Sequence, residues 1–253
     1  MRLRWGMLAV AVAVAVVCAA VLIRPARSDG TAAPTGVVWR VPTGEPDIAL
    51  TFDDGPDPTF TPQMLQLLRA HGARGTFFVL GSQAARYPAI VRAEAAEGSE
   101  VCNHGWGHAV LSGRTSAVVT QNVARTRAVL QRLGIPQCGL FRFPYFASDA
   151  AARQIVEGLG YRIVGASVDT LDWRRRNPRA IAQQVLEGVR PGDIVLLHDG
   201  GGPRARSVQA LALILDGLPE RGLRAVTVSQ LLASAGQGAP AAAQAPRAAG
   251  GPN

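Results

Sequence analysis

The sequence predicts an α/β protein, a distorted (β/α) barrel of about seven strands in a single domain. Apolar runs that suit buried strands alternate with segments of helical periodicity over about 185 residues. Polar residues follow several of these runs, at the C-terminal ends of the expected strands. A ring of parallel strands brings such ends together on one face, whereas an open sheet offers a single switch point. The 253 residues are enough for one domain of this kind.

Seven short apolar runs are expected to form the strands. They are 48–53, 75–80, 99–104, 139–143, 161–168, 193–198 and 223–227. Segments with a repeating apolar face are expected to form the helices between them. These are 61–71, 83–96, 115–133, 149–159, 178–189, 205–217 and 229–234. Regular alternation of this kind implies a parallel sheet with crossover helices.

Segment 1–28 is predicted to be an export signal. Two arginines precede an apolar run from Trp5 to Ile23, and Arg24 closes it. The nineteen residues of the run could just span a bilayer, while residues 26–28 offer a small-x-small cleavage site. An uncleaved membrane anchor and a cleaved signal peptide are both open. The protein is therefore expected to be secreted, or anchored to the outer face of the cytoplasmic membrane.

Composition divides the rest of the chain. Residues 29–44, with their Gly, Pro, Ala and Thr, are predicted to be a linker. Residues 236–253, rich in Gly, Ala and Pro, are predicted to be a disordered tail. The folded domain is therefore expected to cover residues 45–235.

Arginine carries all the positive charge, and 26 basic against 18 acidic residues give a net charge of +8. Removing the four arginines of segment 1–28, which holds no acid, lowers this to +4 (8 − 4). A modest basic surplus suits an anionic polymer or envelope, and solubility alone explains it equally well. No basic run is interleaved with aromatic residues, so a nucleic-acid partner is not expected.

Cys102 and Cys138 are the two cysteines outside segment 1–28. In an oxidising compartment they could pair, because adjacent parallel strands lie about 4.8 Å apart. The two sulfur atoms could also be offset along the third and fourth strands by several ångströms, which would prevent a bond. A disulfide and two buried free thiols are therefore equally open.

Asp53 and Asp54 stand at the C-terminal end of the first strand, before a Gly55-Pro56 turn. Adjacent side chains on a strand point to opposite faces. We therefore expect the two carboxylates to have different roles.

His104 and His108 follow the third strand, four positions apart. On a helical turn this spacing puts both imidazoles on one face, which suits two ligands of one divalent metal; a pair of surface histidines is the alternative. One of Asp53 and Asp54 would complete a His-His-Asp set with open positions for water and substrate, as catalytic sites have. Such ligands suit Zn²⁺, and also Co²⁺, Ni²⁺ or Mn²⁺.

Further polar residues follow the later strands. Arg142 follows the fourth strand, Asp172 and Trp173 follow the fifth, and His198 follows the sixth. Each alone has a structural explanation, as a surface cation, a helix-capping acid, a core aromatic residue or a turn. Their joint placement on one face of one barrel favours an active site.

In this order the residues resemble the polysaccharide deacetylases with a NodB-type domain, carbohydrate esterase family four. The resemblance covers roughly residues 45–235 and rests on five motifs. They are Thr51-Phe52-Asp53-Asp54, His104-x-x-x-His108, Arg142-x-Pro144-Tyr145, Asp169-x-x-Asp172-Trp173 and Leu196-x-His198.

The resemblance implies a metal-dependent hydrolase that removes acetyl groups, usually from N-acetylated sugars, on a distorted barrel of about seven strands. It implies that Asp53 is the general base and His198 the general acid. It also implies that Asp54, His104 and His108 bind the metal, Zn²⁺ in the first place.

Supporting roles follow from the same resemblance. Arg142 would orient Asp53, Asp172 would tune His198, and the backbone N–H of Tyr145 would help to hold the oxyanion. Substrate binding is assigned to Trp173, Leu196 and Tyr145. Gly105 departs from the family, which often has Ser or Thr there to brace the metal loop.

The leading hypothesis is thus an exported de-N-acetylase of an N-acetylglucosamine-containing glycan, either peptidoglycan or chitooligosaccharide. The alternatives are an O-deacetylase of acetylxylan and a non-catalytic glycan-binding protein on the same scaffold. An acetylated glycan is the expected partner, and the protein is expected to be a monomer.

Overall fold

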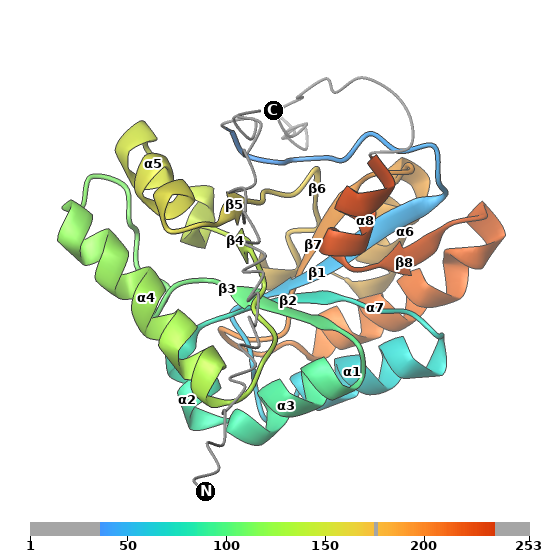
Figure 1. Ribbon diagram of the computed structural model, residues 1–253. Coiled ribbons are helices and arrows are strands. Elements are labelled where there is room, and N and C mark those ends of the chain that lie inside the picture. Colours follow the sequence, from blue (N-terminus) through green and yellow to red (C-terminus); the bar gives the residue numbers. More distant parts are fainter. Residues whose placement is uncertain (1–35, 175–176, 236–253) are drawn as a thin grey trace, which may run out of the picture. The chain divides into compact units, whose positions relative to one another are not determined.

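The computed structural model describes residues 36–174 and 177–235 (Figure 1). The predicted export signal, the first part of the predicted linker and the predicted tail lie outside these residues. Within the described ranges, no helix has both the length and the apolar character needed to cross a bilayer.

One parallel sheet organises the domain. Its central strand, β1 (Asp47–Asp53), is buried along its whole length because it pairs on both sides, with β2 (Thr76–Val79) and with β7 (Ile194–His198). The remaining strands are β3 (Glu100–Asn103), β4 (Leu140–Phe141), β5 (Arg162–Ile163), β6 (Val168–Asp169) and β8 (Arg224–Val226).

The strands follow each other in the order β5-β4-β3-β2-β1-β7-β6, and β8 pairs with the first residues of β1. Every pair is parallel, so the C-terminal ends meet on one face. β5 and β6 are successive in the chain but lie at the two ends of this order. The sheet is therefore a curled half-barrel, which confirms the predicted distorted (β/α) barrel.

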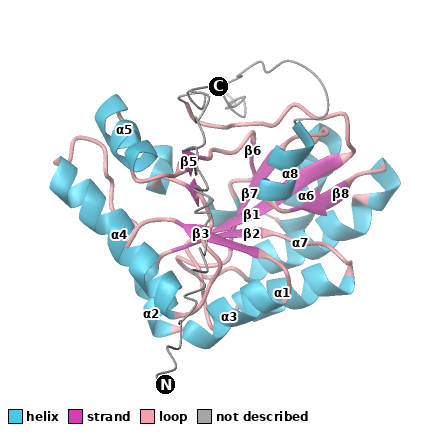
Figure 2. Cartoon of the chain, in the orientation of Figure 1, coloured by secondary structure: helices cyan, strands magenta, loops and turns pink. Residues whose placement is uncertain are grey.

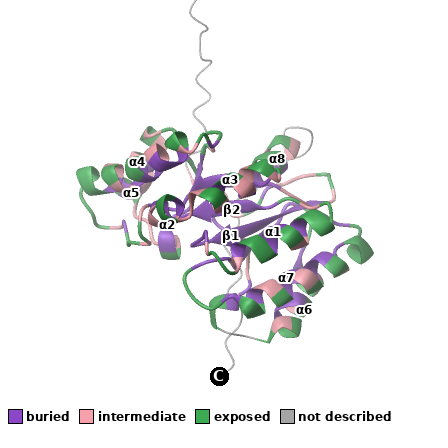
Figure 3. Cartoon of the chain, turned by 90° about the horizontal axis from the view of Figure 1, so that it is seen from below, coloured by how far each residue is buried: buried purple, intermediate pink, exposed green. Residues whose placement is uncertain are grey.

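Helices surround the sheet (Figure 2). They are α1 (Thr61–Ala70), α2 (Gly81–Arg86), α3 (Pro88–Ala96), α4 (Ser116–Arg132), α5 (Ala150–Gly158), α6 (Pro178–Gly188), α7 (Ala205–Gly217) and α8 (Val228–Ser234). Several begin at side-chain caps that the sequence carries, such as Thr115 before α4 and Asp149 before α5. Figure 3 shows the result, with buried strands inside and exposed outer helix faces.

Two expected elements are each divided. The helix predicted over 83–96 is interrupted at Tyr87, because the residue before a proline is pushed out of the helical region. The strand predicted over 161–168 forms two short strands, β5 and β6, joined by residues 164–167. This division leaves the backbone carbonyls of Val164 and Gly165 free to accept hydrogen bonds from the barrel interior.

The predicted linker is wrong for its second half. Val38 forms a β-bridge with Val164, and Arg40 forms one with Asp193. The Trp39 ring packs directly on Gly165, where a Cβ atom would overlap it. Val41 is buried, and the partly buried Val38 packs against the same apolar cluster, so this half of the segment belongs to the folded domain.

Cys102 and Cys138 form a disulfide, with their Cα atoms 5.1 Å apart. Cys102 lies on β3, and Cys138 lies two residues before β4, with which β3 pairs. The bond therefore joins the strand that precedes His104 to the segment that leads to Arg142.

Candidate active site

Asp53 and Asp54 both line one cavity at the C-terminal end of β1. The expectation that they point to opposite faces is wrong, because the strand ends at Asp53 and Asp54 takes a left-handed backbone, with φ +76°. Their partners separate them instead. Asp53 lies against Arg142, and Asp54 lies against His104 and His108.

Asp54, His104 and His108 each offer one ligand atom, and these atoms lie within 4.8 Å of one another. Asp54 Oδ1 is 3.1 Å from His108 Nε2 and 3.5 Å from His104 Nε2. The angles make no hydrogen bond, so this buried oxygen has no hydrogen-bond partner within the described chain. His104 Nδ1 lies 2.8 Å from the Arg142 carbonyl and donates to it, which turns the Nε2 lone pair toward Asp54. The three residues therefore fit a divalent cation.

The protonation of this set also suits a cation. Burial would raise the pKa of Asp54, but contact with the His104 ring and the positive charges of the three neighbouring histidines lower it to about 2. Burial lowers the pKa of His108, against the attraction of the Asp54 carboxylate. An ionised carboxylate and a neutral imidazole are the forms that bind a metal.

The turn that carries the two histidines is not helical. Gly105 has φ +79° and His108 has φ +58°, and the ring centroids of His104 and His108 are 5.3 Å apart. Side-chain amides hold this turn: Gly105 N donates to Asn103 Oδ1 (2.8 Å), and Trp106 N donates to Asn122 Oδ1 (2.9 Å). These bonds brace the loop at the position where the family often has Ser or Thr.

Arg142 is completely buried and is bonded from several sides. Its Nη1 donates to Asp53 Oδ1 at 2.7 Å and to Thr51 Oγ1 at 2.8 Å, and its Nη2 donates to the Gly165 carbonyl at 2.7 Å. Burial lowers the pKa of Arg142, and the adjacent Asp53 carboxylate opposes this. One guanidinium thus fixes the direction of the Asp53 carboxylate.

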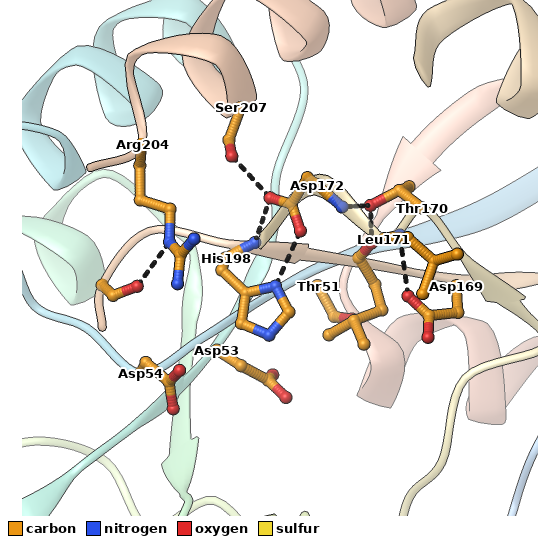
Figure 4. Close-up of polar contacts among 12 residues, drawn as sticks. Thr51, Asp53, Asp54, Asp169, Thr170, Leu171, Asp172, His198, Arg204 and Ser207 are labelled. Atoms are coloured by element: carbon orange, nitrogen blue, oxygen red, sulfur yellow. Dashed lines mark hydrogen bonds and ion pairs between the residues drawn. The ribbon is translucent and has the colours of Figure 1, made fainter. Parts of the chain in front are cut away.

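His198 is held by Asp172 (Figure 4). Asp172 Oδ1 accepts from His198 Nδ1 at 2.8 Å, while Oδ2 accepts from the His198 backbone N–H at 2.9 Å and from Ser207 Oγ at 2.6 Å. Burial would lower the pKa of His198, but the bond to Asp172 and the charges of Asp172, Asp53 and Asp54 raise it. With Nδ1 engaged, Nε2 is the atom that can exchange a proton with a substrate.

The cavity has a volume of about 490 Å³. Leu196 forms part of its wall, and two aromatic side chains stand at its edge, Tyr145 (66% exposed) and Trp173 (46% exposed). The Tyr145 ring meets the His108 ring edge-on, with centroids 4.3 Å apart. The structure thus brings every residue that the sequence suggested for the site to one place.

Two polar residues at the site were not predicted. Ser207 supports Asp172, and Arg204 lines the cavity although it is 6% exposed. Both come from the start of α7, which follows the glycine-rich turn after His198. Arg204 stands at the N-cap position of α7 and not directly after a strand, so the search for polar residues at strand ends does not find it.

A carboxylate held by arginine and an imidazole held by a second carboxylate face one cavity. A pair of this kind suits a base and an acid in the hydrolysis of an acyl group, so the site defines a candidate acyl hydrolase. Residues 40–164 match the family model described as polysaccharide deacetylase.

The relatives agree with this match. A peptidoglycan-N-acetylglucosamine deacetylase of Bacillus cereus is 40% identical over 202 residues, which cover 79% of this chain and 94% of that protein. A chitooligosaccharide deacetylase of Sinorhizobium fredii is 38% identical over 199 residues, covering 73% of this chain and 91% of that protein. A solved structure of a peptidoglycan N-acetylglucosamine deacetylase superposes with a TM-score of 0.75 at 33% identity, covering 78% of this chain and 92% of that chain. The chain belongs to the polysaccharide deacetylase family, and it is a polysaccharide de-N-acetylase.

Proposed function

We propose that the protein is an exported, metal-dependent enzyme that removes N-acetyl groups from an N-acetylglucosamine-containing glycan, either peptidoglycan or chitooligosaccharide. The observation that carries this proposal is the shared cavity of Asp53, His198 and the Asp54, His104 and His108 set. The peptidoglycan and chitooligosaccharide deacetylases to which the chain is similar support the class of substrate.

Asp53 is the general base of the proposed reaction. Its Oδ1 is engaged by Arg142 at 2.7 Å, and its Oδ2 lies 3.7 Å from His104 Nε2, beside the candidate metal ligands. A carboxylate in this place can take a proton from the water that attacks the acetyl carbonyl. Arg142 keeps the carboxylate correctly oriented.

His198 is the general acid. An amide nitrogen leaves poorly as an anion, so the collapse of the tetrahedral intermediate needs a proton for the departing sugar nitrogen. Asp172 holds Nδ1 and favours the imidazolium, so His198 Nε2 can donate that proton. Water and amide thus give acetate and the free amine.

Asp54, His104 and His108 would hold the metal, with Zn²⁺ first and Co²⁺, Ni²⁺ or Mn²⁺ as alternatives. A divalent cation would polarise the acetyl carbonyl and increase the acidity of the attacking water. The contribution of the protein is to present one carboxylate and two imidazoles there, with His104 oriented by the Arg142 carbonyl.

Trp173, Tyr145 and Leu196 are proposed to contact the sugar. The exposed faces of two aromatic rings beside a cavity suit the apolar faces of a pyranose, and Leu196 provides an apolar wall. The backbone N–H of Tyr145 is proposed to help hold the oxyanion.

Segment 1–28 is proposed to direct export, as either a cleaved signal peptide or an anchor. Residues 236–253 are proposed to be a tail outside the catalytic domain, and the enzyme is proposed to act as a monomer. The mass of the purified exported protein distinguishes cleavage from anchoring.

Acetate release from three polymers tests the function. Peptidoglycan, chitooligosaccharides and acetylxylan are compared at equal acetyl content with metal-loaded protein. We expect release from one or both N-acetylated glycans and much less from acetylxylan. Release from acetylxylan alone would replace the proposal with an O-deacetylase.

A further inference from the structure

Arg204 has no role in the proposed reaction, yet it lines the catalytic cavity. The residue is 6% exposed and precedes α7. Its Nε donates to the Gly200 carbonyl at 2.6 Å, which fixes the position of the guanidinium. The turn that provides this carbonyl packs on Asp54, since a Cβ atom on Gly201 would lie 2.6 Å from Asp54 Oδ2. Arg204 is therefore tied to the backbone beside the candidate metal ligands.

The guanidinium of Arg204 has no acidic partner. Among the described residues, no carboxylate oxygen lies within 4 Å of its nitrogens, and its Nη atoms make no hydrogen bond. These Nη atoms are not sealed in the core, because they remain accessible from the cavity. Burying a cation without a counter-ion costs free energy, so a site of this kind suits an anion that arrives with a ligand.

The carboxylates that line the cavity have partners other than Arg204. Asp53 is paired with Arg142, and Asp54 faces the two histidines that would share a cation with it. Asp169 accepts a hydrogen bond from the backbone of Leu171. Figure 4 shows Arg204 and Asp169 on opposite sides of the His198 ring. A negative group of the substrate would thus be attracted to the Arg204 side and repelled from the Asp169 side.

The position of Arg204 indicates which part of a substrate it would meet. It lies in the segment that continues from His198, the residue that protonates the departing sugar nitrogen in the proposed reaction. If His198 protonates the sugar nitrogen, substituents of the acetylated sugar or of its neighbour would lie on that side of the cavity. A planar carboxylate can accept two parallel hydrogen bonds from a guanidinium, whereas a neutral hydroxyl gains much less from the charge.

We propose that Arg204 forms a carboxylate-binding subsite, which selects glycans that carry an acidic group next to the acetylated sugar. The lactyl carboxylate of a muramic acid residue has this chemistry, and a chitooligosaccharide has no counterpart. This inference rests on the proposed function and deepens it, since it ranks an acidic glycan above a neutral one.

A matched pair of substrates tests the subsite. The first is an oligosaccharide of alternating N-acetylglucosamine and N-acetylmuramic acid with free lactyl carboxylates, and the second is the same oligosaccharide with each carboxylate converted to its methylamide. Wild-type protein is expected to favour the carboxylate form by about 10- to 100-fold in kcat/KM, the range of one charge-assisted hydrogen bond. This preference is expected to appear as a lower KM for the carboxylate form. Arg204→Gln is expected to remove this preference, and Arg204→Lys to keep part of it.

Arg206→Gln is the matched control, because Arg206 is an exposed arginine two residues further along the chain. It should keep the preference of the wild type. Thermal unfolding of each variant shows whether the fold is intact. If Arg204→Gln does not fold, the preference of Arg204→Lys for the carboxylate form over the methylamide form is the deciding measurement.

Calorimetric Kd values for the two oligosaccharides give a second readout that does not depend on turnover. A tighter Kd for the carboxylate form that Arg204→Gln abolishes supports the subsite even in a protein that releases no acetate, so the two proposals can fail separately. Equal affinity of the wild type for both forms, or an equal loss on both forms in Arg204→Gln, would overturn the carboxylate subsite.

Discussion

Asp172 accepts two hydrogen bonds from His198, one from the ring Nδ1 at 2.8 Å and one from the backbone N–H at 2.9 Å. The two bonds use different oxygens of one buried carboxylate. The backbone bond fixes the position of the carboxylate, so the His198 ring cannot turn without losing its own bond to Asp172. Ser207 donates to the same carboxylate at 2.6 Å. This arrangement fixes both the direction and the charge of the proposed acid.

Asp172→Asn should therefore change the pH profile as well as the rate. The pKa of His198 is raised in the wild type, so the protonated acid is present below that pKa and is lost as the pH rises through it. Loss of the carboxylate charge lowers this pKa, and the alkaline limb of kcat/KM should move to lower pH. We expect the maximal rate to fall about 10²-fold. Ser207→Ala, which keeps the charge, should shift the limb less, and an unchanged limb in Asp172→Asn would exclude His198 as the acid.

Asp53→Asn and Asp54→Asn should separate the roles of the two adjacent acids. Asp53→Asn should keep the metal and lose about 10² to 10⁴ in kcat, the usual contribution of one general base. Asp54→Asn should lose the metal, because it removes the charged ligand of the set. Elemental analysis of both variants is the measurement. Equal metal content in the two proteins would show that the roles are not divided in this way.

Chelation should abolish activity, and Zn²⁺ or Co²⁺ should restore it. The Asp54, His104 and His108 set motivates this prediction. His108→Ala should weaken metal binding, measured as the metal retained on dialysis, while His71→Ala, far from the cavity on a surface helix end, serves as the control. A metal-free protein with full activity would contradict the mechanism.

Arg142→Ala should destabilise the fold, in addition to reducing activity. The substitution leaves the buried Asp53 carboxylate without its cation, and breaking a buried pair in this way costs about 3 to 5 kcal/mol of unfolding free energy. Denaturant unfolding measures the loss. Arg40→Ala, which removes a partly exposed ion pair with Asp193, should cost no more than about 1 kcal/mol. A similar loss of unfolding free energy in both variants would show that burial does not make the Arg142–Asp53 pair more important for stability than a partly exposed pair.

The disulfide between Cys102 and Cys138 should be present in the purified protein. Thiol titration of the denatured, unreduced chain should find no free thiol besides that of Cys18, where segment 1–28 is retained. Cys102→Ser together with Cys138→Ser should lower the unfolding free energy by about 2 to 5 kcal/mol. Two additional free thiols in the wild type would refute the bond.

The sequence is sufficient to predict the barrel and the identity of most site residues, because strand periodicity and strand-end polar residues are local signals. It is not sufficient to predict the backbone that orients these residues. Asp54, His108, Tyr145, Phe146 and Leu171 all have positive φ without being glycine. Local preference disfavours each of them, so tertiary contacts are needed to impose them. Arg204 was missed for a related reason, since burial of a charged side chain depends on a cavity formed by several distant strands.

The bridges of Val38 and Arg40 to the barrel also set a limit on where an anchored form could work. Between Ile23, the last residue of the apolar run, and the first described residue, Gly36, there are twelve residues, 24–35. Even fully extended, twelve residues span no more than about 43 Å. An enzyme that kept its membrane anchor would therefore reach only the glycan layer closest to the bilayer, whereas a cleaved enzyme could diffuse to acetyl groups at any depth.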